Sequence, residues 1–154
     1  MKYIISLLFL VLSISAQEKI GIRVKDAWIR PAATGMNTAL FFTVTNNTES
    51  VDTLFDASAS AADLVEVHET YTDGDKMGMR RTKAVLNPGE TVEFKPRSLH
   101  VMFIKLLKDM KIGDTQEVTL HLKNAGDVKI TAEVKDNMPA TMRKEMNEKK
   151  MDWF

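Results

Sequence analysis

The sequence contains no cysteine among its 154 residues. This absence excludes disulfide bonds, thiolate metal ligands and catalytic thiols, and it excludes blue-copper sites, which require a cysteine ligand. The chain also lacks an excess of one charge, because its 21 Lys and Arg residues equal its 21 Asp and Glu residues. Domains that bind nucleic acid are usually strongly basic, so we expect no nucleic-acid partner.

Two common catalytic motifs are also missing. The sequence has no glycine-rich loop of the kind that binds phosphate and no glycine-flanked serine of the hydrolase type. The sequence therefore gives no support for nucleophilic or hydrolytic catalysis.

Only one long apolar run is present, and it lies at the start of the chain. Residues 4–14 are mostly apolar, follow the positive charge of Lys2 and end at the small residues Ser15 and Ala16. This pattern is typical of a secretory signal peptide over residues 1–16. An uncleaved anchor is the alternative, but the run is shorter than the roughly 20 residues that span a bilayer. We expect an exported protein without stable membrane insertion after cleavage.

The rest of the chain divides into one domain, residues 17–136, and a tail, residues 137–154. The domain consists of short segments in which apolar and polar residues alternate, separated by turn residues such as Asp73-Gly74. Such a series, with no helical pattern, predicts an all-β sandwich of Greek-key, immunoglobulin-like type. The predicted strands are Ile20–Ile29, Leu40–Val44, Leu64–Thr70, Lys76–Arg81, Thr91–Lys95, Val101–Leu107, Glu117–Leu122 and Val128–Val134.

Histidine and methionine occur together near the ends of these strands. His100 and Met102 are two residues apart, so in a strand both side chains project from one face. His68 precedes the Asp73-Gly74 turn, and Met77 and Met79 follow it. Thioether sulfur is a soft ligand that favours Cu(I), and neutral imidazole completes a suitable set. The pattern therefore predicts a copper site.

Other interpretations remain open for some of these residues. Met102 precedes Phe103 and Ile104 and is able to pack in the core instead. Glu66 and Glu69 flank His68 and raise the alternative of zinc, or of Cu(II) at an accessory site with oxygen ligands. We favour a solvated strand edge for both carboxylates. His121 alternates with Leu120 and Leu122, so we interpret it as a surface histidine.

The tail carries a methionine stripe. Met138, Met142 and Met146 are four residues apart and share one face of a helix, if the tail is helical. They indicate either an amphipathic helix that packs on the domain or a disordered segment that forms an accessory copper site.

Several segments together resemble the PCu(A)C family of periplasmic copper chaperones. The resemblance spans about residues 24–134 and includes Asp26–Pro31, Val65–Glu69, Met77–Arg80 and His100–Met102. The family pattern is a histidine, a later methionine, and then a histidine and methionine two residues apart.

By this resemblance the metal ligands are His68, Met79, His100 and Met102. The interval between Met79 and His100 is one residue shorter than in the usual pattern, so Met77 is kept as a reserve candidate. The resemblance implies a cupredoxin-like sandwich, a function without enzymatic activity, and delivery of Cu(I) to the CuA centre of cytochrome c oxidase in the periplasm. We expect a monomer that serves the CuA-containing subunit or another copper acceptor.

Two other functions remain open. The same site would suit a periplasmic copper-buffering or resistance protein. Without a metal, the domain would be a β-sandwich interaction module whose methionines pack in the core.

Overall fold

The computed structural model describes residues 21–137, and their regular structure is entirely β-strand. This part of the chain contains no helix that could cross a membrane. The predicted signal peptide and the tail beyond Asn137 lie outside the described residues. The ten strands are β1 (Ile22–Ile29), β2 (Thr38–Asn46), β3 (Asp52–Ser58), β4 (Ala62–Asp73), β5 (Lys76–Arg81), β6 (Ala84–Leu86), β7 (Thr91–Phe94), β8 (Leu99–Leu106), β9 (Thr115–Leu122) and β10 (Gly126–Val134).

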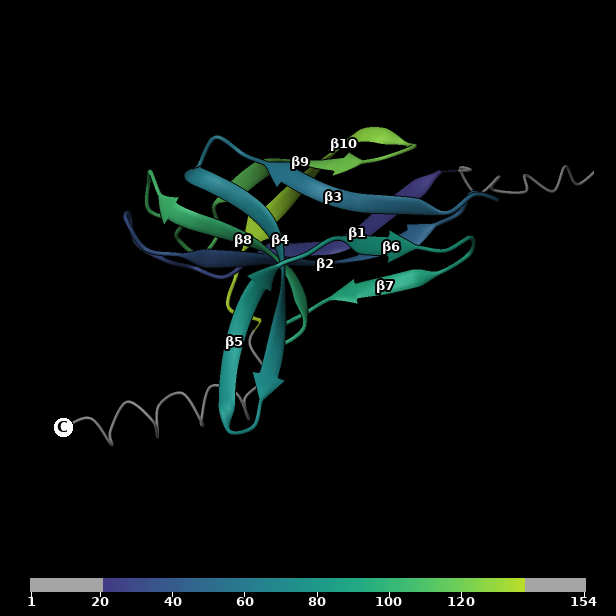
Figure 1. Cartoon of the computed structure of the whole chain (residues 1–154). Helices are drawn as coiled ribbons and strands as arrows, with labels where there is room; N and C mark the ends of the chain where they lie inside the picture. The colour runs from purple at the N-terminus through teal and green to yellow at the C-terminus, as the bar shows by residue number, and fades with distance from the viewer. Residues whose placement is uncertain (1–20, 138–154) are drawn as a thin grey trace, which may run out of the picture.

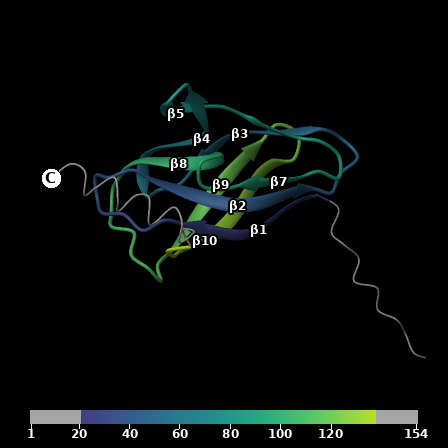
Figure 2. The ribbon, with the colours of Figure 1, turned by 90° about the horizontal axis from the view of Figure 1, so that it is seen from below.

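The strands form one hydrogen-bonded path that curls into two layers. The order is β5-β4-β8-β2-β1-β10-β9-β3-β6, and β7 pairs with β2 beside this path. Strands β3, β9 and β10 form one layer, while β1, β2 and β8 lie in the other (Figures 1 and 2). The predicted all-β sandwich is therefore confirmed.

Alternation along the strands builds the core between the layers. In β4 the side chains of Val65 and Val67 are buried in the core, while Glu66 and His68 project from the opposite face. Val101 and Phe103 of β8 fill the same core, and both are completely buried. Each such side chain contributes about 1.5–3 kcal/mol when it leaves water.

Two strands are absent from the sequence prediction. β3 contains a register shift between Leu54 and Asp56, which interrupts the alternation that marks a strand. β6 has only three residues. Both strands still bury a leucine completely, Leu54 in β3 and Leu86 in β6.

β4 is longer than predicted, and its two halves have different partners. Its first part pairs with β8, whereas its end pairs with β5 in a hairpin closed by Gly74. This hairpin projects from the body of the sandwich (Figure 1). His68 is therefore not near the outer end of its strand, as the sequence suggested, but at the junction where β4 pairs with both neighbours.

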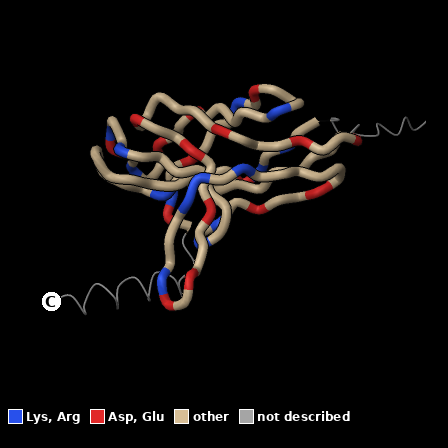
Figure 3. The backbone as a smooth tube through the Cα atoms, viewed as in Figure 1, with Lys and Arg blue, Asp and Glu red and all other residues tan. Residues whose placement is uncertain are grey.

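Charged residues of both signs are interspersed along the strands and loops. Figure 3 shows Lys and Arg alternating with Asp and Glu over the described chain, as the balanced composition suggests.

Candidate metal centre

The predicted ligands lie on one face of three neighbouring strands. His68 of β4 is directly opposite His100 of β8, and the centroids of the two rings are 6.0 Å apart. Met102 of β8 is opposite Glu66, two residues from His68 along β4. Directly opposite residues share a face, so β4 and β8 bring both imidazoles and one thioether together.

The projecting hairpin adds two more thioethers. Met79 of β5 is opposite Thr70, and Met77 is opposite Thr72. Both threonines lie on the face of β4 that carries His68, since they are two and four residues from it. The hairpin therefore places Met77 and Met79 beside the histidine pair, with the Met79 position nearer to it.

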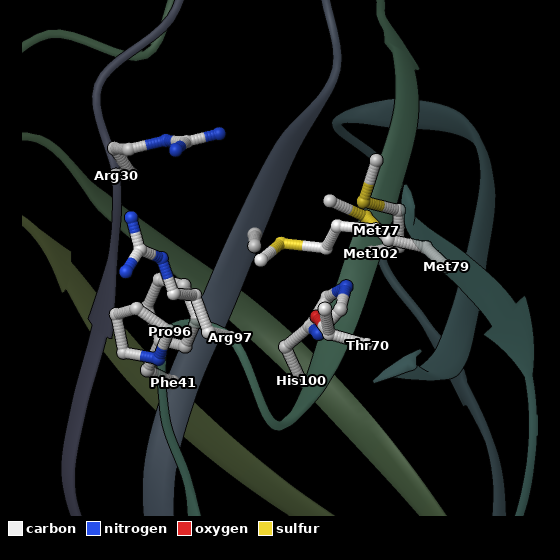
Figure 4. A pocket seen from close by; sticks show the side chains of 10 residues that line it. Arg30, Phe41, Thr70, Met77, Met79, Pro96, Arg97, His100 and Met102 are labelled. Carbon is white, nitrogen blue, oxygen red and sulfur yellow. The ribbon is translucent and has the colours of Figure 1, made fainter. Parts of the chain in front are cut away.

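A cavity of about 150 Å³ opens at this face. Three methionine side chains lie close to His100, and Arg30 and Arg97 lie on the opposite side of the cavity (Figure 4). Met77 is 58% exposed and Met79 57% exposed, so both residues are accessible from outside. The residues that line the cavity are Arg30, Ala39, Phe41, Thr70, Met77, Met79, Pro96, Arg97, His100 and Met102.

One ring nitrogen of His100 has a hydrogen-bond partner and the other has none. Its Nδ1 lies 2.9 Å from the carbonyl oxygen of Ser98. A carbonyl can only accept a hydrogen bond, so Nδ1 carries the proton and Nε2 of the neutral ring carries the lone pair. That Nε2 atom is buried and has no hydrogen-bond partner.

Burial also favours the neutral form of His100. Desolvation lowers the pKa of this imidazole, and the charges of His68 and Arg30 lower it further, whereas the Ser98 carbonyl raises it. The net pKa is below the ordinary value of 6.5. A histidine must be neutral to bind a metal ion, so the surroundings keep His100 in the binding form.

His68 has the opposite arrangement of its ring nitrogens. Its Nε2 lies 2.8 Å from Oε2 of Glu66, which as a carboxylate can only accept. In the neutral ring the lone pair therefore lies on Nδ1, which is buried and unpartnered. His68 does not line the cavity but lies beside His100, across the β4–β8 pair.

These two nitrogens have a common chemical property. Among residues 21–137 they are the buried side-chain nitrogen and oxygen atoms that lack a hydrogen-bond partner. Leaving a buried polar atom unpaired costs about 1–3 kcal/mol, and a metal ion is one group that would satisfy such an atom. Two neutral imidazoles with neutral thioethers fit Cu(I) better than a harder ion.

The structure corrects two sequence interpretations at this face. Glu66 is not part of a solvated edge, because its side chain is only 14% exposed and is bonded to His68. In the sequence, the only sign of this contact is that Glu66 lies two residues before His68, so that both project from the same face of a strand. Met102 is not a core residue, since it lines the cavity.

Other candidates lie away from the cavity. The carboxylate of Glu69 accepts a hydrogen bond from Nε of Arg80 at 2.7 Å. Over residues 21–137, no three His, Asp or Glu side chains are grouped to hold a metal ion. The alternative of a zinc or Cu(II) site with oxygen ligands therefore lacks a ligand group in this part of the chain. His121 lies on β9 between Ser58 and Asp127. The predicted tail ligands Met138, Met142 and Met146 lie outside the described residues.

Structural comparison finds copper-protein domains with the same fold. The copper-bound PCuAC domain from PmoF2 is 24% identical with a TM-score of 0.63, covering 76% of this chain and 95% of that domain. The apo PCuAC domain from PmoF1 is 22% identical with a TM-score of 0.66, covering 76% and 96%. The Cu(I) form of DR1885 from Deinococcus radiodurans is 25% identical with a TM-score of 0.57, covering 75% and 80%.

Sequence comparison gives a family. A "Putative lipoprotein" from Leifsonia xyli subsp. xyli is 30% identical over 118 residues, which are 75% of this chain and 70% of the relative. The model of the family described as "Putative lipoprotein LpqE-like" matches residues 22–134, which include all ten strands and every predicted ligand of the domain. The chain therefore belongs to the LpqE-like family.

Proposed function

We propose that this protein is an exported copper carrier that binds one Cu(I) ion at the β4–β5–β8 face. The ion is cargo, held by His68, His100, Met102 and Met79, with Met77 beside them. The observation that carries the proposal is the pair of buried, unpartnered imidazole nitrogens next to three thioethers at an open cavity. The copper-bound relatives of the same fold support copper as the metal.

The asymmetry of the site suggests how the ion is passed on. His100 is nearly buried at 3% exposure, whereas Met77 and Met79 are more than half exposed on the projecting hairpin. An incoming ligand of the acceptor therefore reaches the sulfur side first. Because the exposed methionines lie on this side, they are displaced before the nearly buried His100. Transfer is thus a ligand exchange without an enzymatic step.

The acceptor that we propose is the CuA-containing subunit of cytochrome c oxidase, in the periplasm. The sequence resemblance carries this part, together with the signal-peptide pattern of residues 1–16. The lipoprotein descriptions of the family and of the relative from Leifsonia also support export. A buffering protein with the same site would hold copper without a dedicated acceptor.

The test of the site is a competition titration with a Cu(I) chelator under reducing conditions. Wild-type protein should bind one equivalent at the domain site, and the double variant His100→Ala/Met102→Ala should lose that equivalent while keeping its β-sheet circular dichroism. His121→Ala is the matched control, because it removes a histidine far from the cavity, and it should bind as wild type does. Unchanged affinity in the double variant would remove the site assignment.

Two further measurements separate the alternatives. Cu(I) at about a hundred times its dissociation constant should raise the stability of the folded state by about 2.7 kcal/mol, whereas a metal-free module would show no change in melting temperature. Mixing the loaded protein with an apo CuA domain should move copper to that domain. Retention of copper by the carrier would favour a buffering role.

A further inference from the structure

The carboxylate of Glu66 lies beside the proposed copper site with both oxygens engaged. Its Oε2 accepts from Nε2 of His68, and its Oε1 lies 3.3 Å from a terminal guanidinium nitrogen of Arg81. A second nitrogen of Arg81 lies 3.4 Å from Oδ2 of Asp56 in β3. A chain of polar contacts therefore runs from β3 through β5 to the ring of His68.

The carboxylate is paired because it is mostly buried. A charge removed from water requires a partner, and pairing of this kind contributes more to a defined geometry than to net stability. The side chain of Glu66 is 14% exposed, while that of Arg81 is 57% exposed. Arg81 therefore pairs with the buried carboxylate from the more exposed side, and the other carboxylate oxygen contacts His68.

The two acceptors beside the histidines impose different tautomers. The Ser98 carbonyl requires the proton of His100 on Nδ1, and the Glu66 carboxylate requires the proton of His68 on Nε2. The atoms left with lone pairs are those that are buried and unpartnered. Hydrogen bonds of this kind commonly fix the ring orientation of metal-binding histidines.

We propose that Glu66 is a positioning residue that selects the tautomer of His68, so that this histidine offers Nδ1 to copper while His100 offers Nε2. The copper part of this inference rests on the proposed function, whereas the tautomer part does not. In this proposal Glu66 acts on His68 rather than as a copper ligand, because its two oxygens contact His68 and Arg81.

Arg81 extends this role to the methionine hairpin. It is the last residue of β5, lies directly opposite His68 and is two residues from Met79. Its bonds to Glu66 and Asp56 therefore fasten the base of the hairpin to β4 and β3. The same network that orients one imidazole thus also fixes the strand that carries the exposed thioethers.

The first arm of the test uses wild-type apoprotein labelled with ¹⁵N in its histidines. Long-range ¹H–¹⁵N correlation spectra report which ring nitrogen carries the proton. We expect Nε2–H for His68 and Nδ1–H for His100. A His68 ring with its proton on Nδ1 would overturn the proposal, and this arm requires no variant to fold.

The second arm compares two neighbouring carboxylates. In Glu66→Leu the acceptor is removed and no metal ligand is added, so we expect His68 to populate both tautomers and Cu(I) affinity to fall about tenfold to a hundredfold. His100 should keep its tautomer, because its Ser98 partner is untouched. E66Q keeps one acceptor oxygen, and we expect it to restore most of the preference. Glu69→Leu is the control, since the carboxylate of Glu69 pairs with Arg80.

The outcomes separate this inference from the proposed function. A change of tautomer in Glu66→Leu with no Cu(I) binding by either protein, wild type included, would defeat the copper function and leave the positioning role intact. Unchanged tautomer and affinity in a folded Glu66→Leu protein would defeat the positioning role alone. In the copper-loaded wild type, a metal-shifted ¹⁵N resonance at Nε2 of His68 would also defeat it.

Discussion

The ring of Tyr71 lies directly over Gly78, its partner across the β4–β5 hairpin. A Cβ at position 78 would be 2.6 Å from both Cζ and the hydroxyl oxygen of Tyr71. The guanidinium carbon of Arg80 stacks on the same ring, 5.3 Å from its centroid. Gly78 lies between Met77 and Met79, so the space at this position controls the geometry of both thioethers.

Gly78→Ala should therefore weaken copper binding without unfolding the sandwich. The added methyl forces the Tyr71 ring to move and strains β5 by about 1 kcal/mol, which corresponds to roughly fivefold in Cu(I) affinity. The melting temperature should change little, because the hairpin projects from the core (Figure 1). The double variant Tyr71→Ser/Gly78→Ala removes the clash and should recover the affinity. A single variant with wild-type affinity would show that the hairpin geometry is not limiting.

The positions of the two hairpin methionines predict unequal roles. Met79 is opposite Thr70, one step along the face from the His68–His100 pair, while Met77 is opposite Thr72 and a further step away. Met79→Leu should reduce Cu(I) affinity more than Met77→Leu, since leucine keeps the volume and removes the sulfur. The sulfur coordination number from X-ray absorption of the loaded proteins checks the same point. A larger loss in Met77→Leu would reverse the ligand assignment.

The alternation of residues was sufficient to predict the sheet and the faces of its strands. In β4 the apolar residues Val65 and Val67 alternate with Glu66 and His68, and the structure buries the two valines more deeply than the residues between them. Where the period is broken, as at the register shift between Leu54 and Asp56, the strand could not be recognised. The pattern reports only local geometry, so it identifies a strand but not its partner.

The candidate site depended on pairing that the sequence alone does not contain. That His68 lies opposite His100, and Glu66 opposite Met102, follows from the register of β4 on β8. Residue types and spacing were enough to predict the ligands. The hydrogen bond between Glu66 and His68 could not be predicted in this way, because it depends on the burial of both side chains, each 14% exposed. A carboxylate near a histidine in sequence does not by itself reveal whether the two side chains are buried together.

The methionine stripe of the tail yields a prediction that is independent of the domain site. If Met138, Met142 and Met146 bind copper, replacing all three with leucine should lower the total Cu(I) taken up and leave the affinity of the first equivalent unchanged. A titration that resolves successive equivalents measures both quantities. Equal uptake by the variant and the wild type would assign these methionines a role other than copper binding.

A buried carboxylate far from the copper face anchors the turn between β9 and β10. Asp52 is 4% exposed, and its oxygens accept from the backbone N–H groups of Thr53, Asn124 and Ala125 at 2.7–2.9 Å. Burial alone raises the pKa of Asp52, but these backbone hydrogen bonds outweigh burial and lower the pKa below its ordinary value of 3.8. The folded state therefore stabilises the charged form.

Asp52→Asn should lower the free energy of unfolding at neutral pH, and the loss should be smaller at acidic pH. The amide offers one acceptor oxygen in place of two and loses the charge, so we expect a loss of about 1–3 kcal/mol near pH 7. Because the folded pKa lies below the unfolded one, the wild-type advantage is complete above the unfolded pKa of 3.8 and declines as pH falls toward the folded value. Urea unfolding near pH 7 and near pH 3 measures the free energy of unfolding of both proteins, and the difference between wild type and Asp52→Asn should be smaller at pH 3. The exposed carboxylate of Asp63, paired with Lys105, provides the control: Asp63→Asn should change stability less, because water already solvates that pair. A gap between wild type and Asp52→Asn that stays constant with pH would mean that the shape of the side chain, rather than its charge, holds the turn.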